Sequence, residues 1–352
     1  MPQPQPITLS SGIAIGAGCP CFVVAEVGNN HQGKYDLARE MVLKAAEIGV
    51  QAVKFQKRDI DALLTQRGQM MPYCGPNSFG RTYGEHRRAL ELDIEEMARL
   101  KELAESLGLV FFASAWDQVS LQQLSGLGVE LIKICSADVV NIPLIRQAAA
   151  LDIPVIMSTG MSTWEEIDRA VQELKQFHTQ IVLLHCNSSY PCPEKEIALP
   201  VMLQLQQRYD LPIGYSGHEL GLAPTLAAVA LGACVAERHF TLNRNLTGTD
   251  HQLSLDTAEF KFLVAMIREI EQAMAVKEKQ VFPEEKKVAH KLQKSIVATQ
   301  DLKRGHIITE HDITGKSPGT GMRPCVWDAL IGKGIKRNVS KDEMLTWDIL
   351  KE

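Results

Sequence analysis

Short apolar runs alternate with amphipathic stretches along the first three-quarters of the chain. The runs have the β-rich, continuously apolar character of strands buried on both faces. They lie at residues 22–27, 52–56, 109–114, 131–136, 154–158, 181–186, 212–216 and 233–240. A helical pattern follows each run. The order predicts an α/β fold, a TIM (β/α)8 barrel, because the rival doubly wound open sheet does not need so many parallel strands in sequence.

Local signals mark where some of these helices begin and end. The helix over residues 92–108 is expected to end at Gly108, the usual residue just beyond a last turn. The sequence over 162–174 predicts a helix that opens with a capping box of Ser162 and Glu165. A strongly periodic helix over 257–275 should close the eighth unit.

The character of the sequence changes after the predicted barrel. Residues 277–294 are polar and charged and include Pro283, a composition typical of a linker. From Ser295 the chain has short β-like pieces, many turns and little helix. We therefore expect a barrel over 1–276, a linker over 277–294 and a small domain over 295–352. So small a domain buries little apolar surface alone and should pack on a partner.

A long insertion follows the second predicted strand. It runs from Ile60 to Glu91. Insertions at this position of a barrel lie on the catalytic face or at an interface. The insertion is therefore a candidate part of the functional site.

Composition and charge narrow the classes of function. The chain of 352 residues has a formal net charge of −5. This argues against nucleic acid or an anionic membrane as the main partner, because both attract basic surfaces. No window approaches the ~20 apolar residues of a membrane span, and the N-terminus lacks the features of a signal peptide. The eight cysteines lack zinc-ligand or redox-pair spacing, which favours free thiols in a reducing cytoplasm.

Polar side chains follow the predicted strands at their C-terminal ends, where TIM barrels place their active sites. Burying a lysine or glutamate there without a partner would cost several kcal/mol. These residues are Glu26, Lys54, Gln56, Ser114, Lys133, Ser136, Ser158, Ser216, His218, Glu237 and His239, together with the turn from Asn187 to Tyr190. The pattern predicts an active site. No Rossmann fingerprint or Walker A loop is present, so nicotinamide and ATP cofactors are disfavoured.

Two lysines should point into the same mouth. Lys54 and Lys133 could each be a lysine that extends its amine to water from a strand end. One of them could also form a Schiff base, as in barrel aldolases. Two lysines beside several serine hydroxyls favour a third interpretation, a site for a phosphate or carboxylate.

Two histidines end neighbouring strands. His218 and His239 are within reach of one divalent ion, although a lone histidine is more often structural. Glu237 shares the inward face of its strand with His239 and could orient a ligand or a lysine. Glu26 is a candidate general acid or base, with an ion pair to Lys54 as the alternative. Asp250 could accept a hydroxyl or simply begin a helix.

A set of motifs resembles the sialic acid synthase family. The motifs, in order, are AEVGNNHQG, AVKFQ, KICSAD, IMSTGM, SSYPCP, GYSGHE, ALGACVAERHFTL and GTDHQLSL. The resemblance runs from about Cys21 to the C-terminus. The segment TYGEHRRALE (82–91) is closer to the animal-type synthases than to the common bacterial ones. The tail from Ser295 resembles the antifreeze-like (SAF, β-clip-like) domain that closes these enzymes.

The resemblance implies a reaction. Phosphoenolpyruvate condenses with N-acetylmannosamine, or its 6-phosphate, to give N-acetylneuraminate, or its 9-phosphate, and inorganic phosphate through C–O cleavage. A divalent ion, Mn²⁺ or Mg²⁺, holds the sugar aldehyde. The resemblance also implies a homodimer in which each SAF domain covers the other subunit's barrel.

Three other functions are alternatives. A synthase of legionaminic or pseudaminic type would use a diacetamido hexose as acceptor. A metal-dependent pyruvate aldolase would need no phosphate site, and the two lysines argue against it. A catalytically silent barrel with a carbohydrate-binding module would not need His218, His239 and Lys133, which are all present.

The resemblance also implies roles for individual residues. Those around phosphoenolpyruvate are Lys54, Ser114, Lys133, Ser136, Ser158, Ser188 and Ser216. The metal ligands are His218 and His239, and Glu26 is the carboxylate near the metal-bound water. The sugar-binding residues are Gln56, Asp138, Tyr190 and Asp250, while Glu237 supports the site.

The chain departs from the family pattern in the predicted small domain. The family's Lys-Arg-Pro-Gly reads Lys316-Ser317-Pro318-Gly319 here, so its arginine is missing, and Arg323 in the same loop is a candidate substitute. A basic cluster in the insertion raises a separate question. Arg81, His86, Arg87 and Arg88 could bind a 6-phosphate or form a solvated charged face.

Overall fold

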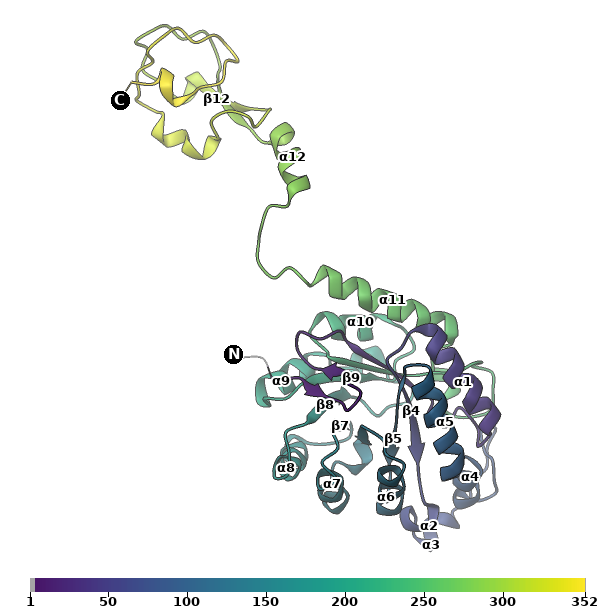
Figure 1. Cartoon of the computed structure of the whole chain (residues 1–352). Coiled ribbons are helices and arrows are strands. Elements are labelled where there is room, and N and C mark those ends of the chain that lie inside the picture. Colours follow the sequence, from purple (N-terminus) through teal and green to yellow (C-terminus); the bar gives the residue numbers. More distant parts are fainter. Residues whose placement is uncertain (1–3, 352) are drawn as a thin grey trace. The chain divides into compact units, whose positions relative to one another are not determined.

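The computed structural model describes residues 4–351 and divides the chain into two compact units, which meet between Ala275 and Val276. Within the described residues of the first unit, eight parallel strands close into a barrel in the order β10-β3-β4-β5-β6-β7-β8-β9 (Figure 1). The strands are β3 Phe22–Glu26, β4 Ala52–Lys57, β5 Val110–Ala115, β6 Ile132–Ile134, β7 Val155–Ser158, β8 Ile181–Cys186, β9 Ile213–Gly217 and β10 Val235–His239. The predicted TIM barrel is confirmed.

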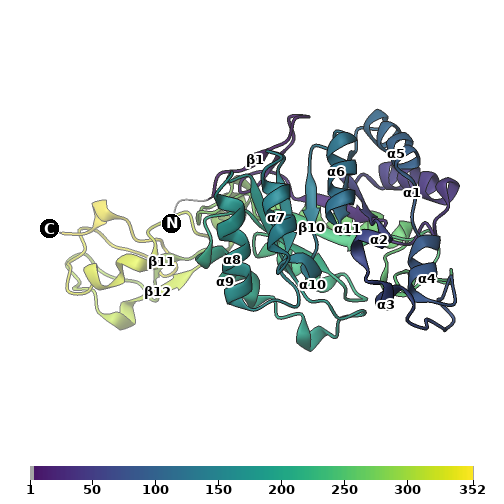
Figure 2. The same cartoon turned by 90° about the horizontal axis from the view of Figure 1, so that it is seen from below.

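Helices follow the strands and surround the barrel. Those that directly complete the eight units are α1 Tyr35–Ile48, α5 Ile94–Ser106, α6 Gln118–Gly126, α7 Ile142–Ala149, α8 Trp164–Lys175, α9 Pro200–Arg208, α10 Ala223–Ala230 and α11 Thr257–Ala273. Helices α6, α7 and α8 lie side by side on the outside of the strands (Figure 2). Short 3-10 turns occur at Ser136–Asp138, Glu194–Glu196 and His251–Leu253. None of the helices within residues 4–351 is long and apolar enough to span a membrane.

Strand alternation builds two separate apolar cores. Outward residues such as Val53 and Phe55 on β4 pack against the surrounding helices. Inward residues such as Phe22 and Phe112 fill the lower part of the barrel. Above that apolar layer, at the C-terminal ends, the inward positions become polar. The interior of the barrel is therefore filled by apolar side chains at its N-terminal end and lined by polar side chains at its C-terminal end.

A short antiparallel hairpin covers the packed end. It consists of β1 Ile7–Thr8 and β2 Ala14–Ile15 (β1 is labelled in Figure 2). Ile7, Leu9 and Ile15 are buried in the same core as the inward strand residues. The N-terminal end of the barrel is thus closed by side chains that the sequence pattern did not point to.

Two expected helix ends have different outcomes. Gly108 follows the cap of α5 with a φ of +78°, as predicted for a residue that must take a left-handed conformation. The predicted capping box of Ser162 and Glu165 is wrong by one residue. Thr163 caps α8 and pairs reciprocally with Glu166, because the Ser162 hydroxyl instead donates to the Gly160 carbonyl at 3.2 Å.

The insertion after β4 contains three short helices within the described chain. They are α2 Ile60–Leu63, α3 Gln66–Gln69 and α4 Tyr83–Ala89. Helix α4 opens with a capping box between Thr82 and Glu85. Its buried residue His86 anchors the insertion through ring contacts with Tyr73, whose centroid lies 4.3 Å away.

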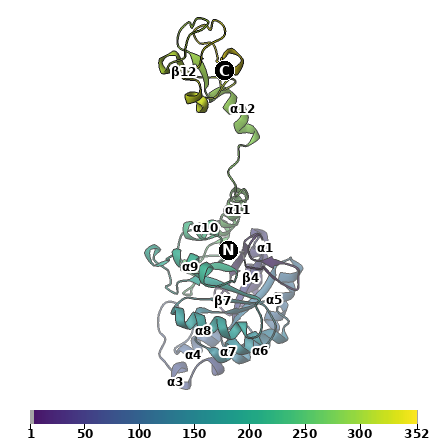
Figure 3. The same cartoon turned by 90° about the vertical axis from the view of Figure 1, so that its left-hand side faces the viewer.

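The second unit is drawn in green to yellow in Figure 3, and its buried apolar residues form a core of their own. Its elements are α12 Pro283–Leu292, β11 Ser295–Ala298, β12 Ile313–Lys316 and the 3-10 turns Glu310–Asp312, Pro324–Ala329 and Trp347–Ile349. Strands β11 and β12 pair antiparallel. Residues 277–294, expected to be a plain linker, contain helix α12. Pro283 begins that helix instead of interrupting it, because proline has no N–H to lose in a first turn.

Candidate active site

A cavity of about 410 Å³ lies at the C-terminal ends of the strands. It brings together almost all of the residues predicted for the site. Those that line it are Glu26, Lys54, Gln56, Ser114, Lys133, Ser136, Ser158, Ser188, Tyr190, Ser216, His218, Glu237, His239 and Asp250. Parallel strands in a closed barrel explain this convergence, because every strand ends at the same mouth.

Two predicted residues do not line this cavity. The Asp138 carboxylate accepts hydrogen bonds from Asn141, at 3.0 Å, and from the Cys135 thiol, at 3.5 Å. It therefore serves the local turn after β6. Arg323 lies in the second unit, where it is exposed and precedes a 3-10 turn.

Two lysines and two glutamates form the buried charged centre of the cavity. Lys54 Nζ lies 2.7 Å from Glu26 Oε2 and 3.7 Å from Glu237 Oε1. Lys133 Nζ lies 3.0 Å from Glu237 Oε1, which also accepts a hydrogen bond from the Ser216 hydroxyl at 3.0 Å. All four charged side chains are at most 7% exposed. The charges compensate one another in a place where an unpaired ion would be costly.

The two glutamates differ in how readily they take up a proton. Burial raises the pKa of Glu26 above its ordinary value, and the Lys54 ammonium only partly opposes this effect. Burial acts on Glu237 too, but there the ammonium groups of Lys133 and Lys54 outweigh it and lower the pKa to about 2. Paired carboxylates whose environments separate their pKa values commonly divide the acid–base and electrostatic roles. Glu26 is the group suited to proton transfer.

A chain of side chains orients Glu26. Gln56 Nε2 donates to Glu26 Oε1 at 2.7 Å, and Arg58 Nη2 in turn donates to Gln56 Oε1. Arg58 also stacks on Trp116, with its guanidinium carbon 4.6 Å from the ring centroid. The sequence analysis missed both residues. The alternation Lys54-x-Gln56-x-Arg58, which keeps one face of the strand, could have identified Arg58.

The two predicted metal ligands are neighbours at the mouth. The ring centroids of His218 and His239 are 5.5 Å apart. His218 Nδ1 donates to the Asn187 carbonyl at 2.6 Å, which leaves Nε2 as the free coordinating nitrogen. His239 Nδ1 is buried without a hydrogen-bond partner, and burial lowers the pKa of His239 to about 3, so that the ring stays in its neutral, metal-binding form.

The donor set suits a partly open metal site. Among residues 4–351 no group of three or more His, Cys, Asp or Glu side chains is arranged to hold a metal ion. Two imidazoles can hold one ion when water and substrate oxygen complete the shell. The residues present therefore fit a metal that is shared with a substrate.

Serine hydroxyls complete the deep part of the cavity. Ser158 Oγ is buried and has no hydrogen-bond partner. Ser114 Oγ accepts a hydrogen bond from Trp116 Nε1 at 3.1 Å, and Ser136 Oγ accepts one from the Gly160 N–H at 3.0 Å. A hydroxyl that accepts in this way keeps its own proton free for an anion.

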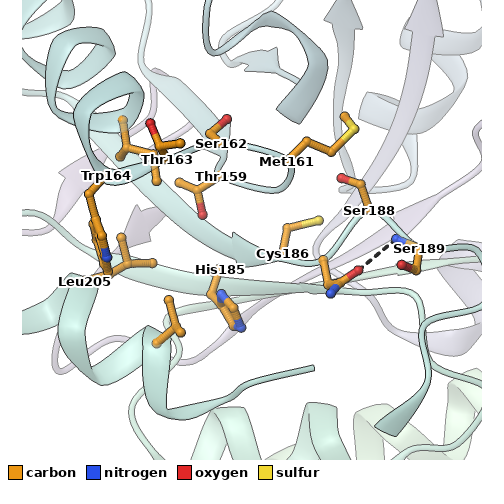
Figure 4. A pocket seen from close by; sticks show the side chains of 13 residues that line it. Thr159, Met161, Ser162, Thr163, Trp164, His185, Cys186, Ser188, Ser189 and Leu205 are labelled. Carbon is orange, nitrogen blue, oxygen red and sulfur yellow. Dashed lines mark hydrogen bonds between the residues drawn. The ribbon is translucent and has the colours of Figure 1, made fainter. Parts of the chain in front are cut away.

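A second cavity, of about 470 Å³, adjoins the first (Figure 4). Met161, Cys186 and Ser188 line both cavities. Trp164 of α8 and Leu205 of α9 form part of its apolar wall. The turn after β8 is stiffened by a hydrogen bond from the Ser189 N–H to Asn187 Oδ1 at 2.8 Å. Because Ser188 lines both cavities, it is accessible from two sides.

The insertion contributes the outer wall of the active-site cavity. Tyr73, His86 and Arg87 line it, which agrees with the expectation that the insertion lies on the catalytic face. The other arginines of the predicted basic cluster do not line the cavity. Arg88 is exposed and pairs with Asp61 at 2.7 Å, and Arg81 is also exposed.

Comparison with known proteins decides the family. The NeuB family matches residues 41–279, and the SAF domain matches residues 293–351. The chain belongs to the NeuB family. The predicted resemblance to sialic acid synthases is confirmed at this level, and the second unit is the SAF domain of a NeuB-family protein.

Relatives of different sugar specificity are about equally similar to this NeuB-family chain. The chain is 36% identical over 350 residues to the N-acetylneuraminate-9-phosphate synthase of Homo sapiens, covering 99% of this chain and 98% of that protein. It is 37% identical over 340 residues to the N,N'-diacetyllegionaminic acid synthase of Legionella pneumophila, covering 95% of each. These identities show a nonulosonic acid synthase without distinguishing the sugar.

A solved structure supports the same assignment. The N-acetylneuraminic acid synthetase of Leptospira borgpetersenii in complex with citrate is similar with a TM-score of 0.72 and 34% identity, covering 81% of this chain and 95% of that one. This NeuB-family chain is thus a phosphoenolpyruvate-dependent nonulosonic acid synthase. Enzymes of the family take an acylated amino sugar as acceptor and typically use a divalent metal.

Proposed function

We propose that the chain condenses phosphoenolpyruvate with N-acetylmannosamine, or its 6-phosphate, to give N-acetylneuraminate, or its 9-phosphate, and inorganic phosphate. One observation carries the proposal. The buried Lys54–Glu26 and Lys133–Glu237 pairs share a single cavity with the imidazoles of His218 and His239. An anion site beside a two-histidine site is what a reaction between phosphoenolpyruvate and an aldehyde needs.

The deep half of the cavity is the proposed phosphoenolpyruvate site. The ammonium groups of Lys54 and Lys133 compensate the carboxylate and phosphate charges of this substrate. The serine hydroxyls above the apolar layer add neutral donors, and these are Ser114, Ser136, Ser158 and Ser188. Ser216 also lines the cavity, but its hydroxyl donates to Glu237. Glu237 on β10 forms ion pairs with both lysines and helps to orient them.

The histidines are the proposed ligands of Mn²⁺ or Mg²⁺. When bound, such an ion polarises the aldehyde oxygen of the open-chain sugar as a Lewis acid. The protein's own part is to fix the two rings. The Asn187 carbonyl holds His218, and Tyr190 packs on the same ring with a centroid distance of 4.0 Å.

Glu26 is the proposed proton acceptor. Carbon 3 of phosphoenolpyruvate bonds to the aldehyde carbon, and positive charge then develops at carbon 2. Water adds to carbon 2 as Glu26 takes up one of its protons, and a proton is returned to the alkoxide that the aldehyde has become. The tetrahedral centre then loses phosphate by cleavage of the C–O bond, and the proton of its hydroxyl passes to the phosphate as the ketone forms. The raised pKa of Glu26 suits this step, because a more basic carboxylate is a better acceptor near neutral pH.

The outer half of the cavity is the proposed sugar site. Gln56, Tyr190 and Asp250 line it and offer amide, phenol and carboxylate groups to hydroxyls and the N-acyl group. Asp138 does not line the cavity and is left out of the proposed pocket. A diacetamido hexose as acceptor is the second candidate, and the similarity to the Legionella pneumophila legionaminic acid synthase favours it.

The test is phosphate release from phosphoenolpyruvate with Mn²⁺. N-acetylmannosamine, its 6-phosphate and a 2,4-diacetamido hexose would be compared, each with and without a chelator. Release that requires metal and one of the first two acceptors is the expected result, and the His218→Ala variant should show none. Release with the diacetamido hexose alone would establish the second candidate. No release with any acceptor would overturn the proposal.

A further inference from the structure

Three basic residues lie together on the outer wall of the active-site cavity. They are Arg58, His86 and Arg87, and we refer to them as the basic rim. Arg58 helps to orient Glu26 through Gln56, and the three residues otherwise take no part in the proposed steps. The backbone advances by about 13 Å between Lys54 and Arg58, at ~3.3 Å per residue. The basic rim is thus nearer the mouth than the lysines.

Arg58 is fixed in place and still has an unused donor. It is 3% exposed. Its Nη1 donates to Glu91 at 2.9 Å and to Asn29 at 3.2 Å. Its Nε is buried and has no hydrogen-bond partner within the described chain. A buried guanidinium N–H without an acceptor is costly, and an anion oxygen would satisfy it.

His86 adds a second donor. Its Nδ1 accepts a hydrogen bond from the Phe79 N–H at 3.1 Å. The neutral ring therefore carries its proton on Nε2. Burial, reinforced by the charges of Arg87 and Arg58, lowers the pKa of His86. The fields of both guanidinium groups therefore reach this one ring.

Arg87 is held by a neighbouring tyrosine and not by a carboxylate. Its Nε and Nη2 donate to the Tyr83 hydroxyl at 2.9 and 2.7 Å, and its guanidinium lies over the Tyr83 ring. Within residues 4–351 it forms no ion pair, whereas its neighbour Arg88 pairs with Asp61. Glu91 is shared between Arg58 and Lys57, which lies 3.8 Å away, and Asp250 is another carboxylate near the basic rim, so Arg87 stays without a direct carboxylate partner in the described chain.

We propose that the basic rim binds a phosphate ester on the acceptor sugar, at the end of the sugar remote from the aldehyde. This inference rests on the proposed function and identifies the acceptor as a hexosamine 6-phosphate. Several donors without acceptors and the charges of two guanidinium groups match the multiple oxygens and the double charge of a phosphate monoester. A neutral diacetamido hexose would leave these donors unsatisfied.

The test uses two adjacent arginines of the full-length protein. Arg87→Gln removes the charge of a residue that lines the cavity, and Arg88→Gln removes an exposed charge outside the cavity. Binding of N-acetylmannosamine 6-phosphate and of N-acetylmannosamine would be measured by calorimetry in the presence of Mn²⁺. The wild type and Arg88→Gln should bind N-acetylmannosamine 6-phosphate at least about tenfold more tightly than N-acetylmannosamine. Arg87→Gln should weaken binding of the phosphorylated sugar about 10- to 100-fold.

Two further measurements identify the source of the effect. The Michaelis constant for phosphoenolpyruvate should not change in Arg87→Gln, because that substrate's phosphate is assigned to the lysines. Inorganic phosphate should displace the phosphorylated sugar only at concentrations well above those at which the phosphorylated sugar itself binds. Competition by inorganic phosphate that equals that of the sugar phosphate would mean that the site takes a free anion, and it would overturn the assignment to the acceptor.

Equal affinity of the wild type for both sugars would also overturn the inference, as would equal weakening of both by Arg87→Gln. Because calorimetry needs no turnover, these results are distinguishable from failure of the proposed function. If the enzyme binds the sugar phosphate through Arg87 but releases no phosphate, the role of the basic rim stands and the proposed reaction is wrong.

Discussion

Single residues at the floor of the cavity show how a buried ion pair can also be a binding site. Lys133 is 2% exposed, and its ammonium group donates to both oxygens of Glu237, at 3.0 and 3.3 Å. Before substrate arrives, Glu237 compensates this charge. A substrate anion would add a partner without requiring the lysine to move. Preorganised charge of this kind costs little reorganisation during binding.

Replacing Lys133 should affect the Michaelis constants of the two substrates differently. Lys133→Ala is expected to raise the Michaelis constant for phosphoenolpyruvate about 10- to 100-fold, the value of a charged hydrogen bond, and that for the sugar much less. Steady-state kinetics with each substrate varied in turn would show the difference. Lys101→Ala, at a surface pair with Glu105, is a matched control. An equal rise for both substrates would argue against the role assigned to Lys133.

At the same scale, the strand-end residues of the site could be predicted, because a parallel barrel carries every strand end to one mouth. Arg58 and Trp116 were missed because each lies just beyond its strand. Tyr73 lies in an insertion whose only regular elements are short helices, so no hydrophobic period indicates where its side chain points. Asp138 was placed by motif alone, and a local turn takes up its carboxylate.

At the scale of elements, a buried ion pair joins the two strands that carry the histidines. Glu219 directly follows His218, and Arg238 directly precedes His239. Arg238 Nη1 donates to Glu219 Oε1 at 3.0 Å, and both side chains are 1% exposed. The Tyr215 hydroxyl completes the group by donating to Glu219 Oε2 at 2.9 Å. The Glu219–Arg238 pair therefore helps to fix the distance between the imidazoles of His218 and His239.

Breaking that pair should loosen the metal site. Glu219→Gln is expected to lower the free energy of unfolding by about 3–5 kcal/mol, because the buried Arg238 charge loses its partner. It should also weaken Mn²⁺ binding. Denaturant unfolding and calorimetric titration with Mn²⁺ would test the two effects separately. The double variant Glu219→Gln/Arg238→Met should recover part of the stability. Unchanged Mn²⁺ affinity in a folded Glu219→Gln variant would contradict the link.

A second prediction at this scale concerns the pair that ties α8 to α9. Arg208 and the Tyr209 hydroxyl donate to Asp168 and lower the pKa of its carboxyl to about 2. A lowered carboxyl pKa stabilises the fold above the ordinary value of 3.8 and loses that effect as pH falls toward 2. The side chains of Arg208 and Asp168 are 46% and 30% exposed. Solvent screening should therefore keep the contribution of this pair to the free energy of unfolding below about 1 kcal/mol.

The measurement for this pair is chemical unfolding of Asp168→Asn and the wild type at pH 7 and pH 3. The variant should be less stable at pH 7, and the difference should shrink at pH 3. A difference that stays constant with pH would show that packing, and not the carboxylate charge, accounts for the change.

The elements differ in how far the sequence could predict them. Barrel strands were found within two residues of their ends because burial on both faces leaves a continuous apolar run. The hairpin of β1 and β2 has strands of two residues each, too short for any period to emerge. Helix α12 was taken for a linker because its surface is charged and none of its residues is buried.

At the scale of the whole molecule, the SAF domain adds a folded unit whose surface is partly apolar. Ile307 and Trp347 are each 54% exposed, and Ile331 is 36% exposed. These side chains would lose their contact with water if so small a domain packed on a partner. The family resemblance implies a homodimer in which each SAF domain covers the other subunit's barrel, and such a dimer would supply a partner surface.

The dimer can be tested by mass in solution. Light scattering coupled to size-exclusion chromatography should give about twice the chain mass of 39.0 kDa. Trp347→Ser should shift the population toward monomer, while Lys303→Ser, an exposed polar change in the same domain, should not. A wild-type mass equal to that of one chain would contradict the proposal.

The hairpin that closes the barrel has a kinetic consequence. Ile7, Leu9 and Ile15 close the N-terminal end of the barrel, so a substrate that binds at the floor of the cavity reaches it from the C-terminal ends of the strands. If phosphoenolpyruvate binds at the floor and the sugar at the mouth, as proposed, phosphoenolpyruvate is expected to bind first. A sugar that arrives early then blocks the passage. We therefore expect ordered addition, in which an excess of acceptor slows the enzyme until more phosphoenolpyruvate is supplied.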